Sequence, residues 1–412
     1  MAVAGTLRPR LARVRAGSML LGPAFVAAIA YVDPGNVASN VSAGAQFGYL
    51  LVWVVVAANL MAGLVQYLSA KLGLVTGRSL PEALRERMPR GGRLAYWAQA
   101  ELVAVATDLA EVVGGAIALN LLFDLPLLVG GVITGLVSMG LLLVQDRRGQ
   151  RPFERVISGL LAVIAIGFLA SLVVAPPSPS GVASGLVPRF SGAESVLLAA
   201  AMLGATVMPH AVYLHSGLAR DRHGQATGNR LAGLLRVTRA DVTLAMLLAG
   251  AVNLAMILLA ATNLRGIPGV DSIAGAHGAV AGTLGGGVAL LFAIGLLASG
   301  LASTSVGAYA GAMIMQGLLR KHVPLLLRRL VTLLPAIVVL AAGADPSRAL
   351  VVSQVVLSFG IPFALIPLVR LTNDRGLMGA DANHRMTSVV AWAIVGVIVV
   401  LNVALIYLTF AG

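Results

Sequence analysis

The chain has 412 residues, of which 58% are hydrophobic and only 11% are charged. Soluble domains carry about 25% charged residues, so this composition excludes a water-soluble enzyme of this length, and the high apolar content excludes a disordered chain. The formal net charge is +13, and the chain contains no cysteine, which excludes disulfides, thiolate metal sites and cysteine nucleophiles.

Apolar segments long enough to cross a membrane follow one another along the whole chain. A helix needs about 20 apolar residues to cross the ~30 Å hydrocarbon core, and eleven segments meet this length. They lie near residues 18–45, 48–73, 94–122, 125–145, 155–175, 193–218, 239–264, 284–318, 323–343, 348–370 and 386–410. Only short polar loops separate them, so we expect a single transmembrane domain over residues 1–412.

A basic cluster precedes the first segment, and it consists of Arg8, Arg10, Arg13 and Arg15. Basic residues followed by an apolar run and a small-residue site at 28–30 are also typical of a cleaved signal peptide. We favour a retained first helix, because the run continues into an interrupted motif and ten further apolar segments follow.

The first segment is interrupted by Asp33-Pro34-Gly35-Asn36. Proline removes a backbone donor and glycine tolerates irregular backbone, so we expect the helix to stop there and to resume near Val37. A helix broken at membrane depth is tolerated where it lines a cavity, and an aspartate beside an asparagine provides oxygen ligands for a cation. The simpler alternative is a kink whose second half is capped by Asp33, although capping alone does not favour a carboxylate in hydrocarbon.

The third segment carries three carboxylates, Glu101, Asp108 and Glu111, and follows a polar stretch at 80–88 that we expect to be a solvated helical loop. At about 100° per residue, the three carboxylates form one stripe along the helix. Such a stripe is typical of a proton relay, and its structural alternative is a set of salt bridges. The two are compatible, because a proton path can run through a paired network.

The sixth segment repeats the interruption with Met208-Pro209-His210. Two interrupted segments at corresponding positions of two halves indicate an inverted-repeat transporter. Met208 alone would be ordinary core filler, but beside a break its thioether favours a borderline transition metal over Mg²⁺ or Ca²⁺. Because histidine titrates near neutral pH, we place His210 on a proton path or gate, whereas for His215 a capping or hydrogen-bonding role is equally open.

The later segments add a glycine-rich stretch, two arginines and a glutamine. Residues 275–287 lack the Lys-Ser/Thr ending of a phosphate loop, so we expect a flexible loop. The apolar run after Arg329 is too short to cross a membrane, so the ninth helix must begin earlier, near His322. Arg328 and Arg329 then lie within the membrane, where they need carboxylate partners. Gln354, like Gln66 in the second segment, is a ligand or an interhelical hydrogen-bonding group.

The distribution of basic residues gives the orientation. With the N-terminus in the cytoplasm and eleven crossings, 26 of the 29 Lys and Arg residues face inward, and only Arg189, Arg265 and Arg348 face outward. Membrane proteins retain basic residues on the cytoplasmic side, so the excess positive charge requires no nucleic-acid partner. The C-terminus is then extracytoplasmic.

Asp33-Pro34-Gly35-Asn36 and Met208-Pro209-His210, with the following residues 211–216, resemble the Nramp family of proton-coupled divalent metal transporters, most of all its bacterial manganese and iron members. The resemblance covers nearly the whole chain, including residues 107–111 and 353–358. It implies an all-α, LeuT-like fold with inverted repeats over 18–175 and 193–370, broken helices 1 and 6, and an extra helix over 386–410.

The resemblance also implies a set of site residues. The metal ligands would be Asp33, Asn36 and Met208, with carbonyls near Ala30 and Ala205, and Gln354 in some conformations. The proton route would use Asp33, Asp108, Glu111, Arg328, Arg329 and His210, with Glu101 on the same stripe. Members of the family usually have Asn after Met-Pro-His, where this chain has Ala211, so we transfer no gating detail from members that carry it.

We therefore expect an alternating-access symporter of the bacterial plasma membrane that imports Mn²⁺, and Fe²⁺ as well, with protons. The metal is the substrate, so no cofactor, no catalytic residue and no obligate protein partner is expected besides the lipid bilayer. A sodium-coupled amino-acid carrier of the same fold is disfavoured, because Asp33 would repel a substrate carboxylate unless the substrate is an amine. The chain lacks the His-Glu-x-x-His motif of an intramembrane protease, and paired broken helices disfavour a channel. A magnesium-selective relative would lack the thioether.

Overall fold

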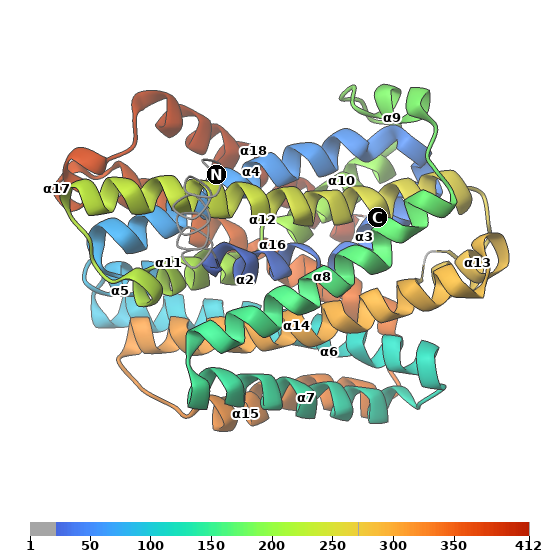
Figure 1. The fold of residues 1–412 in the computed structure, drawn as a ribbon, viewed down its shortest axis with the longest axis horizontal. Coiled ribbons are helices and arrows are strands. Elements are labelled where there is room, and N and C mark those ends of the chain that lie inside the picture. Colours follow the sequence, from blue (N-terminus) through green and yellow to red (C-terminus); the bar gives the residue numbers. More distant parts are fainter. Residues whose placement is uncertain (1–21, 271, 412) are drawn as a thin grey trace, which may run out of the picture.

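The computed structural model describes residues 22–270 and 272–411, and the regular elements among them are all helices (Figure 1). Up to the first long outer loop, they are α2 (Pro23–Ala28), η1 (Ile29–Tyr31), α3 (Pro34–Phe47), η2 (Gly48–Leu51), α4 (Val52–Thr76), α5 (Leu80–Arg85), α6 (Arg90–Phe123), α7 (Leu127–Arg148), α8 (Gln150–Val174) and α9 (Pro179–Gly185). The others are α10 (Gly192–Thr206), α11 (Pro209–His223), α12 (Gly228–Asn263), α13 (Ile273–Leu284), α14 (Gly286–Leu319), α15 (Leu325–Ala341), α16 (Pro346–Asn373), α17 (Arg375–Met378), η3 (Gly379–Asp381) and α18 (Arg385–Ala411). The basic cluster at residues 8–15 and the expected start of the first helix at residue 18 lie outside the described residues.

Within the described residues, nine helical stretches are long and apolar enough to cross a membrane. The stretch Pro34–Thr76 is one of them, although η2 separates α3 from α4, and α15, with 17 residues, falls below the length required. The all-α, polytopic membrane fold is therefore confirmed, while the count of eleven crossings remains a prediction.

The two interrupted helices lie at the centre of the bundle. α2 packs against α8, α11 and α12, η1 packs against α14, and α3 packs against α10 and α12. Figure 1 shows α2 between α12 and α14, with α7 and α15 along one edge of the bundle and α4 and α18 along the other. Other helices thus surround both breaks, and this is where irregular backbone is tolerated at membrane depth.

The first helix resumes at Pro34, not near Val37 as expected. Proline is favourable at the first position of a helix, because its φ is already helical and the N–H that it lacks would have no intrahelical partner there. Asp33 caps the new helix, and its side chain accepts a hydrogen bond from the backbone N–H of Asn36. The proline therefore begins the second half-helix and does not extend the break.

One loop expectation was wrong, and another was right only in part. Residues 275–287 do not form a flexible loop, because α13 covers most of them; the Ser272 hydroxyl caps α13, and Ile273, Ala276 and Val280 are buried at helical spacing. The polar stretch at 80–88 contains a helix, α5, as expected, but it is not fully solvated, since α5 buries Leu80, Ala83 and Leu84. In both segments, apolar residues at helical spacing pack against neighbouring helices and override the polar or glycine-rich composition.

Candidate functional site

The Asp33 carboxylate is fully buried at the first break, and only one of its oxygens is engaged. Oδ1 accepts hydrogen bonds from the backbone N–H of Asn36, at 2.8 Å, and from its side-chain amide, at 2.6 Å. Oδ2 has no hydrogen-bond partner among the described residues. A buried acceptor without a partner costs free energy, so this oxygen is positioned for a ligand.

Neighbouring helices hold the carbonyl groups that the first break frees. The side-chain amide of Asn253 in α12 donates to the carbonyl of Tyr31 at 2.6 Å, and the hydroxyl of Ser299 in α14 donates to the carbonyl of Val32 at 2.6 Å. These bonds satisfy backbone groups that the interrupted helix leaves without partners, and they fix the break between α12 and α14.

The second break lies directly beside the first. α10 ends at Thr206 and α11 begins at Pro209, and Met208 at the junction is fully buried. The Asn36 side-chain amide donates to the Ala205 carbonyl at 3.0 Å, and the Thr206 hydroxyl donates to the Asn36 side-chain oxygen at 3.3 Å. Asn36 therefore joins the two breaks, and it places the Ala205 carbonyl beside Asp33.

Gln354, far along the chain in α16, reaches the same place. A Cβ atom built on Gly35 would lie 1.9 Å from Gln354 Nε2 and 3.2 Å from Asp33 Oδ2. The Gln354 side chain is buried, and neither its nitrogen nor its oxygen has a partner among the described residues. Two neighbouring buried side chains thus present unpaired polar atoms next to the Gly35 backbone.

The donors at the breaks are a carboxylate, amides, backbone carbonyls and a thioether. The described residues contain no group of three or more His, Cys, Asp and Glu that could hold a metal ion, so a cation here would need these mixed donors. Oxygen donors combined with a soft thioether suit a borderline transition metal better than Mg²⁺ or Ca²⁺. Ala30 is buried in η1 at the same break, and its carbonyl remains only an expected ligand.

Asp108 in α6 forms a fully buried ion pair with Arg329 in α15. The Thr304 hydroxyl of α14 donates to Asp108 Oδ1 at 2.7 Å and accepts from Arg329 at 2.8 Å. Arg329 Nε also donates to the Ser138 hydroxyl of α7 at 2.8 Å. One network therefore ties α6, α7, α14 and α15 together.

The other members of the carboxylate stripe lie on either side of this pair. Glu101 forms an ion pair with Arg328 at 2.6 Å. The Arg328 guanidinium lies against the backbone of Gly311, because a Cβ atom built on Gly311 would lie 2.4 Å from it. Glu111 is fully buried against α14, within electrostatic range of both Asp33 and Asp108. The stripe therefore runs from the first break toward the arginines, as a relay and a paired network both require.

The two histidines of α11 have different surroundings. His210 is buried, and neither ring nitrogen has a partner among the described residues. His215 Nδ1 lies 2.6 Å from the Gln66 side-chain oxygen, and the Gln66 amide donates to the Tyr31 hydroxyl. The sequence singled out His215 and Gln66 separately but missed Tyr31, whose only signal was its position two residues before Asp33.

Comparisons with known proteins agree with one another. The family model described as "Nramp: Natural resistance-associated macrophage protein-like" matches residues 24–408. A divalent metal cation transporter, MntH, from Mycobacterium tuberculosis is 69% identical over 394 residues, which cover 95% of this chain and 92% of that protein.

Solved structures give the same result for the fold. A manganese transporter of Eremococcus coleocola, in complex with an aromatic bis-isothiourea substituted compound, superposes with a TM-score of 0.85 at 33% identity, over 94% of this chain and 86% of that chain. A nucleobase-cation-symport-1 family transporter superposes with a TM-score of 0.60 over 94% of this chain and 89% of that chain, and its 17% identity bears on the fold alone.

Proposed function

Because the chain belongs to the Nramp family, and is thus a metal ion transporter and not an enzyme, we propose that it imports Mn²⁺, and Fe²⁺ as well, by symport with protons. We place it in a bacterial plasma membrane with a cytoplasmic N-terminus, which the basic residues support. The metal is cargo, so the transporter needs no resident cofactor. The predicted inverted repeats, 18–175 and 193–370, would rock against each other to expose the breaks alternately to the two sides.

One observation supports the cargo site above all others: the unpaired Asp33 Oδ2 beside the unpaired Gln354 side chain, both buried at the meeting point of the two breaks. In this proposal, Asp33, Asn36, Met208 and the Ala205 carbonyl replace part of the hydration shell of the metal, and Gln354 joins them. The carbonyl of Ala30 is the remaining proposed ligand.

The proton route is the second part of the proposal. A metal ion that approaches Asp33 favours the ionised carboxylate and so releases its proton. The proton would pass toward Glu111 and Asp108, which lie within electrostatic range. Arg329 and Arg328, which pair with Asp108 and Glu101, would line this route, and His210 would contribute at the cargo site.

The test is Mn²⁺ uptake into proteoliposomes with an inward proton gradient, excess external Ca²⁺ and a recorded internal pH. Mn²⁺ entry with internal acidification and without inhibition by Ca²⁺ is the expected result. Asp33→Ala should abolish Mn²⁺ binding measured by calorimetry, whereas Asp108→Asn should weaken the pH dependence of uptake more than it weakens metal affinity. Asp146→Asn, at an exposed position near the end of α7, is the matched control.

The outcomes separate the two parts of the proposal. Mn²⁺ entry without proton movement would keep the cargo site and overturn symport. Retained Mn²⁺ affinity in Asp33→Ala would show that the metal binds at residues other than Asp33. A larger loss of affinity than of pH dependence in Asp108→Asn would make Asp108 a ligand and not a relay group.

A further inference from the structure

A pocket of about 390 Å³ opens where the first turns of α6 meet the last turns of α14. It is lined by Arg90, Arg93, Leu94, Trp97, Met315, Leu318, Leu319 and Lys321. Its volume lies within the range of about 300–1,000 Å³ that is usual for small-ligand pockets. It contains none of the residues of the broken-helix site or of the buried ion pairs.

The charged part of the lining is entirely cationic. Arg90, Arg93 and Lys321 line the pocket, no acidic residue lines it, and none of the three forms an ion pair within the part of the chain that the structure describes. The first turn of α6 also has no acidic residue to offset the positive end of its dipole. The pocket therefore attracts an anion.

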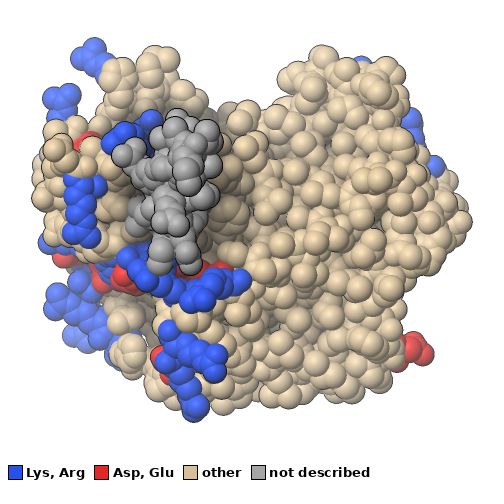
Figure 2. Space-filling view, viewed as in Figure 1, with Lys and Arg blue, Asp and Glu red and all other residues tan. Residues whose placement is uncertain are grey.

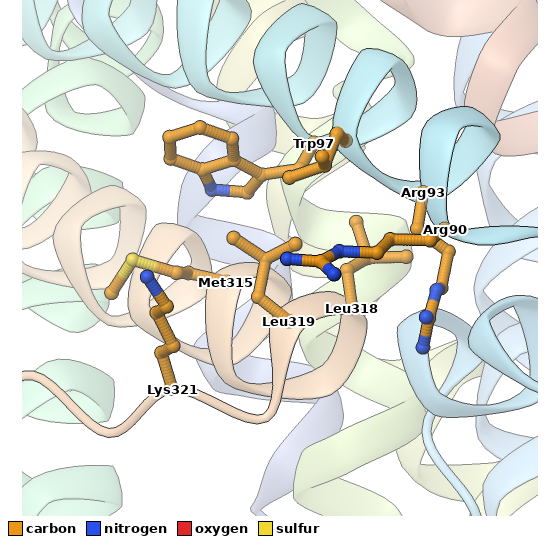
Figure 3. A pocket seen from close by; sticks show the side chains of 8 residues that line it. Arg90, Arg93, Trp97, Met315, Leu318, Leu319 and Lys321 are labelled. Carbon is orange, nitrogen blue, oxygen red and sulfur yellow. The ribbon is translucent and has the colours of Figure 1, made fainter.

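The remaining lining is apolar. Figure 3 shows Trp97 facing Met315, Leu318 and Leu319, with Arg90 and Arg93 toward one end of the pocket and Lys321 toward the other. Trp97 Nε1 is buried and has no hydrogen-bond partner among the described residues, although an indole N–H usually finds one when it is buried. A free donor thus lies between a cationic rim and an apolar wall, which is the combination that tryptophan occupies at membrane interfaces.

We propose that this pocket binds the headgroup of an anionic glycerophospholipid. The phosphodiester accepts hydrogen bonds from Arg90, Arg93 and Lys321, the Trp97 indole donates to a headgroup oxygen, and an acyl chain lies along Leu94, which is 46% exposed. A free phosphate ion satisfies the cations but leaves the apolar wall uncovered, so the chemistry favours a lipid. Basic pockets between helices at the cytoplasmic interface are typical sites for such headgroups.

The bound lipid would connect two elements at the same end of the molecule. α6 carries the carboxylate stripe, and Lys321 lies in the link from α14 to α15, the helix that carries Arg328 and Arg329. The lipid headgroup therefore bridges the base of α6 and the start of this link. This inference does not depend on which metal is transported or on proton coupling.

Trp97 itself is the reporter for the test. The chain has three tryptophans, so Trp53→Phe with Trp392→Phe leaves Trp97 alone in the full-length protein. The protein is reconstituted in phosphatidylcholine vesicles that contain either brominated phosphatidylglycerol or brominated phosphatidylcholine, and the quenching of Trp97 fluorescence is measured at equal mole fractions. We expect the apparent affinity for phosphatidylglycerol to be about fivefold higher than that for phosphatidylcholine, and the ratio to be larger if several of the cations engage the headgroup.

The preference should disappear when Arg90, Arg93 and Lys321 are all changed to Gln. The control is a triple variant that removes the same charge from exposed positions at the basic end, with Gln in place of Arg147, Arg148 and Arg155. It should leave the preference intact. Lys321→Gln alone, at an exposed link residue, should reduce the preference for phosphatidylglycerol. Arg90→Lys with Arg93→Lys keeps both charges and should retain most of the preference. The test therefore does not depend on the folding of one variant.

Three quenching results would overturn the proposal. They are equal quenching by both lipids in the parent protein, an unchanged preference in the triple pocket variant, and an equal loss in the triple control. Millimolar inorganic phosphate should not displace the brominated lipid, and full displacement by phosphate would replace the lipid site with a simple anion site.

Discussion

At the residue scale, Asp33 shows how one side chain can cap a helix and still leave an oxygen atom for a ligand. Oδ1 caps α3 through Asn36, and Oδ2 remains unpaired in a fully buried position. The two interpretations of this motif, a capped kink and a cation site, therefore do not exclude each other. A cap needs only one acceptor atom, and a carboxylate has two.

Replacing Met208 by Ala removes the only soft donor of the proposed cargo site. We expect Met208→Ala to retain part of its Mn²⁺ uptake but to become sensitive to competition by Ca²⁺, because the oxygen donors that remain suit hard cations. The measurement is Mn²⁺ uptake at increasing external Ca²⁺. Met202→Ala, at a buried methionine of α10 away from the junction, is the control, and unchanged selectivity in Met208→Ala would refute the thioether argument.

Replacing Gly35 by Ala tests whether Gln354 belongs to the site. The new Cβ would lie 1.9 Å from Gln354 Nε2, so it must displace that side chain. We expect at least a tenfold loss of Mn²⁺ affinity by calorimetry, equivalent to about 1.4 kcal/mol. Gly204→Ala, whose Cβ would lie 3.6 Å from its nearest neighbour, should bind normally. Wild-type affinity in Gly35→Ala would remove Gln354 from the ligand set.

At the element scale, α15 is a short helix that is anchored by charge as well as by apolar packing. Arg328 and Arg329 occupy adjacent positions in its second turn, and they reach different carboxylates of α6, Glu101 and Asp108. A buried ion pair requires good geometry and additional hydrogen bonds to offset desolvation. Thr304 and Ser138 provide those bonds for Arg329.

Removing Arg329 alone should destabilise the bundle strongly. Arg329→Ala removes one partner of a buried ion pair and leaves Asp108 without its arginine, and such a loss costs about 3–5 kcal/mol. The measurement is the midpoint of thermal unfolding in detergent. Arg87→Ala breaks the exposed pair with Asp374 and should cost no more than about 1 kcal/mol.

A double variant separates charge from packing at the same place. Arg329→Met combined with Asp108→Asn removes both charges, so we expect it to recover part of the midpoint lost in Arg329→Ala. An Arg329→Ala midpoint close to that of Arg87→Ala would contradict the view that Asp108 depends on this arginine.

At the scale of the whole molecule, charge is divided between two ends. Figure 2 shows Lys and Arg gathered over one end of the bundle, while most of the opposite end carries uncharged residues. The basic end includes the last turn of α11, with Arg220 and Arg222. Because basic residues stay on the cytoplasmic side, this end faces the cytoplasm in our proposal, and the loop with α9 faces outward.

The absence of native cysteine makes this orientation directly testable. Ser180→Cys in α9 and Thr227→Cys before α12 are both exposed positions, at opposite ends. A membrane-impermeant maleimide should label Ser180→Cys in intact cells, and it should label Thr227→Cys only after permeabilisation. The reverse labelling pattern would mean that the protein has the opposite orientation in the membrane. Gly412→Cys, at the last residue of the sequence, should be labelled from outside if the number of crossings is odd.

The sequence predicts the membrane class, the two breaks and the residues at them, because Pro, Gly and long apolar runs act on the chain locally. It could not determine where α3 restarts, or that α13 is a helix, since capping and packing outweighed composition in both segments. Tertiary structure alone decided that Gln354 lies against Gly35, that Asn36 reaches the Ala205 carbonyl, and that Arg329 rather than Arg328 pairs with Asp108. These contacts join residues distant in sequence, and they depend on the mutual rotation of long, nearly uniformly apolar helices, which helical periodicity does not specify.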